Sequence, residues 1–208
     1  MSGALEPELD HKTGTPTEEE QLRAGTYSLL AGLLRSPPKE DLFTRLSAIG
    51  AQENARTQGI EAAWAQLKSA AEQTDIATVD DEYHALFIGV GRGELVPYGS
   101  WYLTGFMMEK PLGALRQDLA KLGFERQPNV HEPEDHAAAL CEVMALLIID
   151  DEISFLIQRN FFDAHISPWL ETFFVDVMKA PSARFYRAVG NLGCEFIKLE
   201  KRYFSMLV

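Results

Sequence analysis

Apolar residues recur along this chain at intervals of three and four, and this period constrains the fold more than any other feature. Leu22, Leu29 and Leu33 follow it in the first clear segment, and the same spacing returns between residues 54 and 71. Side chains three or four positions apart share one face of an α-helix. The sequence shows neither the apolar-polar alternation of strands nor a fixed-period repeat. We therefore expect an all-α fold, a single compact bundle of roughly eight to ten helices.

Capping residues, prolines and glycines give the expected helix boundaries. Thr17 with Glu20 predicts a capping box at the start of the first helix, and the prolines of "SPPKE" end it. The acidic residues at 80–82 are expected in the first turn of a helix that stops at Gly89. A proline in "HEPEDH" is expected to start one long helix, from 133 to about 159.

The chain has 208 residues, of which 46% are hydrophobic, and this is enough for one large core. We expect residues 1–16 to be a flexible tail and residues 17–208 to be a single all-helical domain. The first residues lack the pattern of a signal peptide, and the longest apolar run, 143–149, is too short to span a bilayer. These features predict a cytoplasmic protein without stable membrane insertion. Cys141 and Cys194 are expected to be buried free thiols.

Acidic residues outnumber basic ones by 31 to 19, which gives a formal net charge of −12. Binding to nucleic acid phosphates depends on an excess of cations, so this balance argues against a nucleic-acid partner. It is compatible with a basic partner.

Two loop segments carry candidate binding features. The glycine-rich "GVGRG" at 89–93 lacks a GK[ST] ending and follows a helix, so we expect a helix end with a turn and no phosphate cradle. Pro97, Tyr98, Trp101 and Tyr102 follow it and offer an amphipathic contact surface, although core packing explains each of them equally well.

The segment "HEPEDH", residues 131–136, concentrates titratable groups before a helix. A metal site, an acid/base pair and a helix start that binds a ligand are all physically possible. No second Glu-x-x-His and no HExxH accompany it. Adjacent Asp135 and His136 point about 100° apart on a helix, so they do not orient each other. We expect the pair at a pocket mouth, with His136 half-buried and Asp135 exposed. A structural helix start with a hydrogen-bonded histidine remains an open alternative.

Several stretches together resemble the TorD/DmsD/NarJ-type chaperones over residues 20–200. "EYHALFIGVGRGELVPYGSWYL" at 82–103 is similar to their E-(Y/F)-x-x-L-F-x-G…P-x-S-x-Y stretch, and "EPEDH" to their E-P-x-D-H motif. "FFDAHISPWLETF" and "ARFYRAVGNL" fit their C-terminal half. The resemblance implies an all-helical, non-enzymatic protein that binds the twin-arginine signal peptide of a molybdoenzyme or related redox enzyme precursor. Such a protein holds the precursor back from export until its cofactor is inserted.

The resemblance also implies a set of binding residues and partners. By position in the motifs, the signal-peptide-binding residues are Tyr83, Phe87, Pro97, Ser100, Tyr102, Glu132, Pro133, Asp135 and His136. No resident cofactor and no metal are expected. The resemblance implies at most weak binding of a guanine nucleotide. The partners are the signal peptide and the body of the precursor. The chain is expected to be a monomer or a dimer that exchanges segments through a hinge near 123–131.

One alternative belongs to a different class. A helical-bundle metalloenzyme would gather ligands from the cluster at 131–136 and from a histidine further along the chain. Its ligands would be His131, Glu134, His136 and His165.

Overall fold

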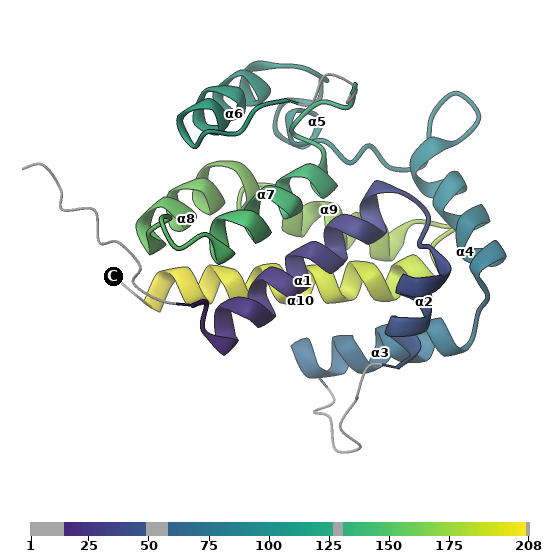
Figure 1. Ribbon diagram of the computed structural model, residues 1–208. Helices are drawn as coiled ribbons and strands as arrows, with labels where there is room; N and C mark the ends of the chain where they lie inside the picture. The colour runs from purple at the N-terminus through teal and green to yellow at the C-terminus, as the bar shows by residue number, and fades with distance from the viewer. Residues whose placement is uncertain (1–14, 49–57, 127–130, 207–208) are drawn as a thin grey trace, which may run out of the picture.

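The structure, a computed structural model, describes residues 15–48, 58–126 and 131–206. These ranges hold ten α-helices, two short π-helical segments and no strand, so the predicted all-α fold is confirmed (Figure 1). In chain order the elements are α1 (Glu18–Arg35), α2 (Glu40–Ser47), α3 (Ile60–Glu72), α4 (Ile76–Tyr83), η1 (His84–Ile88), α5 (Gly99–Thr104), α6 (Lys110–Lys121), α7 (Ala137–Ile149), α8 (Phe155–Phe161), η2 (Phe162–Ile166), α9 (Leu170–Lys179) and α10 (Phe185–Met206).

The long helix α10 is the centre of the bundle. It packs against α9, α3, α1 and α4, while α1 packs mainly against α7. In Figure 1, α5 and α6 lie at one end of the molecule and α3 at the other. Gly193 allows α9 to approach α10 closely, because a Cβ there would lie 2.4 Å from the ring of Phe174. The arrangement leaves α6 above α7 at the edge of the core, where a pocket forms.

A buried ion pair joins α1 to α10, and we call it the core pair. Arg23 donates through Nε to Glu200 Oε1 at 2.7 Å and through Nη2 to Oε2 at 2.8 Å. The two side chains are only 6% and 1% exposed. The guanidinium also stacks 4.1 Å from the ring centroid of Tyr203. This bidentate contact therefore lies in the dry interior of the bundle.

Two expected boundaries at the N-terminal half are confirmed. Thr17 and Glu20 form the capping box of α1, with each side chain accepting the backbone N–H of the other. Gly89 ends η1 at a positive φ of 62°, and a Cβ there would collide with the carbonyl of Arg92. The glycine-rich segment is thus a helix end and turn, as predicted.

The prediction for the acidic residues at 80–82 is wrong. Helix α4 starts at Ile76 with Asp75 as its cap, so these residues lie near its end. Glu82 is buried, and its carboxylate accepts backbone N–H groups at the start of α10 at 2.7–3.1 Å. A carboxylate stabilises a helix N-terminus, and here it comes from another helix. The donors are the N–H groups of Arg184, Phe185 and Tyr186.

The single long helix predicted from 133 to about 159 is also wrong. Helix α7 begins only at Ala137, and a turn after Ile149 separates it from α8. Asp150 accepts the N–H of Glu152 in that turn, and Ser154 caps α8. The break falls at three acidic residues, 150–152, but apolar residues resume at Ile153, so a helix with one polar turn fitted the pattern and the cap was missed.

The remaining expectations concern the two cysteines, membrane insertion, the tail at 1–16 and the loop at 123–131. Cys141 and Cys194 are both free and buried, as predicted. Among the described residues, no helix has the length and apolar character needed to cross a membrane. The predicted tail lies outside the described residues except for its last two positions, and residues 127–130 of the loop predicted as a hinge lie outside them as well.

Candidate functional site

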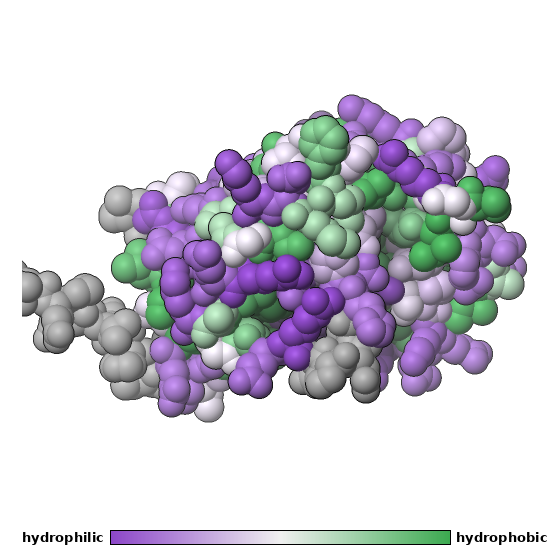
Figure 2. All heavy atoms as spheres, turned by 90° about the horizontal axis from the view of Figure 1, so that it is seen from above, coloured by the Kyte–Doolittle hydropathy of each residue, from purple (hydrophilic) through white to green (hydrophobic). Residues whose placement is uncertain are grey.

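A pocket of about 610 Å³ opens between α6 and α7 and is the candidate site. Figure 2 looks onto the end of the molecule formed by α5 and α6, where hydrophilic side chains border a hollow that has apolar residues at its floor. The pocket draws its walls from α1, α4, η1, α6 and α7, from the segment before α5 and from the segment between α6 and α7. Its lining residues are Arg35, Tyr83, Phe87, Ile88, Pro97, Tyr98, Arg116, Leu119, Phe124, Glu125, Arg126, Glu132, Pro133, Glu134, His136, Ala138, Ala139, Glu142 and Val143.

The two sequence motifs meet in one wall of this pocket. An isolated antiparallel bridge pairs Tyr98 with His136. Ala137 N–H donates to the carbonyl of Pro97 at 2.8 Å, and Gly99 N–H donates to the carbonyl of Asp135 at 2.9 Å. Segments that are far apart in sequence are therefore held in fixed register at the pocket.

His136 lies in the pocket wall at the start of α7. It is the N-cap residue, and its Nδ1 accepts the N–H of Ala138 at 3.1 Å. Its ring packs edge-on against Tyr98, with the centroids 5.0 Å apart. Burial, and then the charge of Arg35, lower the pKa of His136 to about 4. The imidazole is therefore neutral at neutral pH, and half-buried as predicted.

The expectation that Asp135 is exposed at the pocket mouth is wrong. It is 3% exposed, and its Oδ2 accepts the N–H of Ser100 at 2.7 Å. This contact holds the first turn of α5. The other oxygen, Oδ1, has no hydrogen-bond partner within the part of the chain that the structure describes. Helix α7 starts at Ala137, two residues after Asp135, so Asp135 lies in the turn before the helix and not on it. This turn points the carboxylate toward α5.

Carboxylates on the pocket rim already bind arginines of the same chain. Glu134 accepts from Arg116 Nε at 2.9 Å and lies 3.8 Å from Arg126 Nη1. Glu142 pairs with Arg35. Burial acts to raise the pKa of Glu134, but the hydrogen bond from Arg116 and the charges of both arginines lower it overall. We call Glu134 with Arg116 and Arg126 the rim cluster.

The inner wall of the pocket is apolar and aromatic. Phe87 packs 5.0 Å from Tyr83 and 5.4 Å from Tyr186, centroid to centroid. Tyr83 donates to the carbonyl of Leu34 at 3.3 Å. Burial, and then the charge of Glu132, raise the pKa of Tyr83 to about 12, so its hydroxyl stays protonated. The pocket therefore combines a charged rim with a surface that favours apolar groups.

The structure brings together most, but not all, of the residues implied by the resemblance. The pocket is lined by Tyr83, Phe87, Pro97, Glu132, Pro133 and His136. Glu132 also accepts a hydrogen bond from Tyr98. Ser100, Tyr102 and Asp135 are not among its lining residues. Ser100 is buried, and Tyr102 donates to Asp176 at 3.0 Å beside α9. The role of all nine residues in peptide binding stays a prediction.

Sequence reasoning missed the basic and several apolar residues of the site. Arg116 and Leu119 belong to α6, which carried no recognised motif. Val143 lies seven residues after His136, which is the spacing of one helix face, so the sequence does carry a signal for it. For Arg35 and Arg126, which arrive from α1 and from the segment after α6, no local signal exists.

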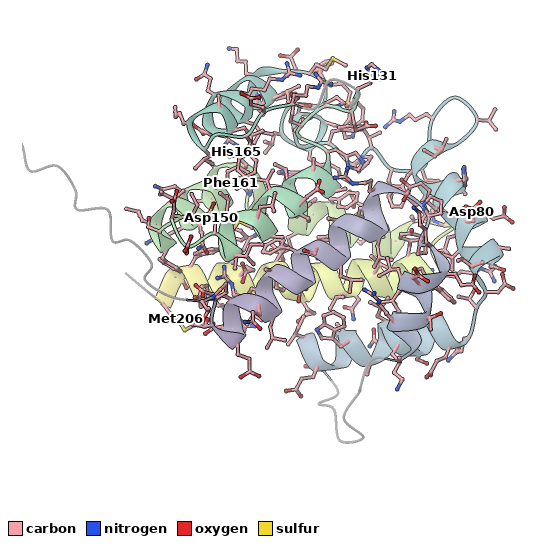
Figure 3. The ribbon with its side chains drawn as sticks, in the orientation of Figure 1. Asp80, His131, Asp150, Phe161, His165 and Met206 are labelled. Atoms are coloured by element: carbon pink, nitrogen blue, oxygen red, sulfur yellow. The ribbon has the colours of Figure 1, made fainter. Side chains whose placement is uncertain are left out.

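The ligands of the alternative metalloenzyme are not gathered in one place. His165 is buried beneath α6, where its Nε2 lies 3.0 Å from Asp118 Oδ2. Figure 3 shows it well separated from His131. Within residues 15–48, 58–126 and 131–206, no group of three or more His, Cys, Asp or Glu side chains could hold a metal ion. The alternative site is thus not assembled from these residues.

Comparison with known proteins places this geometry in a family. Chaperone protein TorD of Vibrio atlanticus is 28% identical over 152 residues, which are 68% of this chain and 66% of that protein. Chaperone protein TorD of Aliivibrio fischeri is 24% identical over 207 residues, which are 91% of this chain and 87% of that protein. The chain thus spans about two thirds of the length of the first relative and more of the second. Both are named as chaperones and not as enzymes, in agreement with the expected class.

A solved structure and a family model agree with these relatives. The crystal structure of a candidate redox enzyme maturation protein from Archaeoglobus fulgidus superposes with a TM-score of 0.53 at 17% identity, covering 91% of this chain and 99% of that one. It shows the same fold. The family model described as nitrate reductase delta subunit matches residues 53–175, which is more than half of the chain. The protein therefore belongs to the nitrate reductase delta subunit family, and its predicted membership of the TorD-like chaperones is confirmed.

Proposed function

We propose that this protein is a cytoplasmic chaperone that binds the twin-arginine signal peptide of a molybdoenzyme or related redox enzyme precursor. In this role it assists cofactor insertion and maturation before export. The family and the relatives named as TorD chaperones support the chaperone class. The peptide site is our inference from the pocket.

The observation that carries this proposal is that the pocket combines carboxylates at its rim with apolar residues on its inner surface. A twin-arginine signal peptide offers two guanidinium groups followed by an apolar stretch. Glu132, Glu134 and Glu142 supply carboxylates at the rim, and guanidinium groups bind carboxylates through paired hydrogen bonds. Leu119 and Val143 extend the aromatic wall into an apolar surface that suits the rest of the peptide.

The first experiment titrates the full chain with a synthetic peptide that carries two adjacent arginines and an apolar stretch. We expect binding to weaken when the arginines become alanine, and separately when the apolar stretch becomes serine. The Glu134→Gln variant should bind about tenfold or more weakly, as expected for loss of a charge-assisted contact.

The matched control is Glu195→Gln on α10, which removes the same charge from a residue paired with Lys198. Glu195 does not line the pocket. The proposal is contradicted if replacing the two arginines, or replacing the apolar stretch, leaves the affinity unchanged. It is also contradicted if Glu134→Gln and wild type bind the peptide equally well.

A further inference from the structure

We propose that Arg116 and Arg126 are internal competitors, which occupy Glu134 in the free chain and are displaced when a guanidinium-bearing ligand binds. This inference rests on the proposed function and concerns its regulation at the same carboxylate. It follows from the occupancy of Glu134, from the exposure of the two arginines and from the anchoring of α6.

The first step is that Glu134 has both carboxylate oxygens engaged. Arg116 contacts Oε2 through Nε at 2.9 Å and through Nη2 at 2.8 Å. Arg126 faces Oε1 through Nη1 at 3.8 Å. The Glu134 side chain is only 18% exposed, so few directions of approach remain. A ligand arginine that binds in the usual paired geometry needs the same oxygens.

The second step is that the resident arginines are easy to displace. Their side chains are 49% and 42% exposed, so each guanidinium keeps part of its hydration while paired. A displaced arginine turns into water and leaves no buried charge behind. An ion pair whose cation stays partly hydrated contributes less net free energy than a fully buried pair. Arg126 also donates to the carbonyl of Glu132 at 3.3 Å, which keeps it near the rim.

The third step is that α6 stays in place when Arg116 moves. The helix is anchored by Leu112, Leu115 and Leu119, all of which are buried. Asp118 is held by the buried His165 at 3.0 Å. The rim contact can therefore exchange by side-chain rotation alone, without unpacking the helix.

The consequence is a threshold for ligands. A ligand with a single weak cation must compete with two tethered guanidinium groups at high local concentration. A ligand with two adjacent arginines can replace both, because it offers as many guanidinium groups as it displaces. The resident arginines thus select against peptides that carry isolated positive charges.

The experiment is a double-mutant cycle with the same diarginine peptide. We expect Arg116→Gln to bind it about three- to tenfold more tightly than wild type, because one competitor is gone. Combined with Glu134→Gln, the Arg116→Gln change should have no further effect. The matched control Arg159→Gln removes the same charge on α8, where Arg159 pairs with Asp163 outside the pocket, and should leave affinity unchanged.

Unchanged or weaker binding by Arg116→Gln overturns the inference. A gain that persists in the Glu134→Gln background also overturns it, since it would reflect general electrostatics. The pKa of Glu134, measured by NMR without peptide, separates the two proposals. If the pKa of Glu134 rises in Arg116→Gln while neither wild type nor any variant binds the peptide, the contact between Arg116 and Glu134 exists in solution. In that case the proposed function is wrong, and the proposed displacement of the arginines is wrong with it. If wild type binds and Arg116→Gln binds equally, only the competition is wrong.

Discussion

The core pair and the rim cluster use the same chemistry in two different environments. Arg23 and Glu200 meet between α1 and α10 with almost no exposure, and stacked aromatic rings cover the guanidinium. Arg116 and Glu134 meet at similar distances on the pocket rim, where the arginine is half exposed. Bond length alone does not distinguish a structural contact from an exchangeable one.

Burial makes the distinction. Removing one partner of a buried pair leaves an uncompensated charge in a medium that solvates it poorly. Removing Glu134 at the rim leaves arginine charges that water can solvate. The core pair should therefore be a permanent part of the fold, and the rim cluster a set of contacts that a ligand can replace.

The largest expected effect is on the core pair. Glu200→Gln leaves Arg23 charged and unpaired in the interior, and we expect it to lower the free energy of unfolding by about 3–5 kcal/mol. Urea denaturation followed by circular dichroism measures this loss. The double variant Arg23→Met with Glu200→Leu should recover most of it, because no buried charge remains. A cost below about 1 kcal/mol for the single variant would erase the contrast between the two regions.

The next effect concerns how the stability of the fold depends on pH through His136 in the pocket wall. The pKa of His136 is about 4 in the folded chain, against an ordinary value of 6.5. Between these values the unfolded chain binds more protons, so stability falls as pH is lowered from 6.5 to 4, by up to about 3 kcal/mol. His136→Asn keeps a helix-capping side chain and should flatten this dependence. The control His84→Asn, at an exposed histidine, should retain the slope.

A smaller effect is expected at Asp135, which lies behind the rim. Asp135→Ala removes the acceptor of the Ser100 N–H and should cost about 1–2 kcal/mol, in line with the loss of a helix cap. Asp135→Asn keeps an acceptor oxygen and should cost less. Thermal unfolding compares the two. Equal costs would mean that the carboxylate charge, and not the hydrogen bond, holds α5.

The smallest effect on stability is expected within the rim cluster itself. Glu134→Gln should change the free energy of unfolding by less than about 1 kcal/mol, while it weakens peptide binding strongly. Urea denaturation and the peptide titration measure the two properties on one sample. A loss of stability comparable with that of Glu200→Gln would show that the rim is as structural as the core.

The sequence predicted the elements of the fold better than their ends. Helical spacing identified the all-α class, and the capping box at Thr17 was correct because both partners lie within one turn. The break between α7 and α8 was missed because apolar residues resume directly after the acidic residues 150–152, which therefore fit one polar turn of a longer helix. Glu82 was misplaced because its partners, at the start of α10, lie about a hundred residues away.

The candidate site was predictable only where its residues lie in recognised motifs. Those motifs led to Tyr83, Phe87 and His136, which the fold brings to one pocket. The orientation of Asp135 depended on a turn that was taken for helix. The rim arginines come from three separate parts of the chain, and no local pattern connects them before the chain is folded.

The hydrogen-bonded crossing of residues 97–100 with 135–137 has a consequence for how such proteins can diversify. It closes the base of an excursion that contains α5, α6 and the segment after them. Insertions or deletions within that excursion can alter the outer half of the pocket while its inner half keeps its shape.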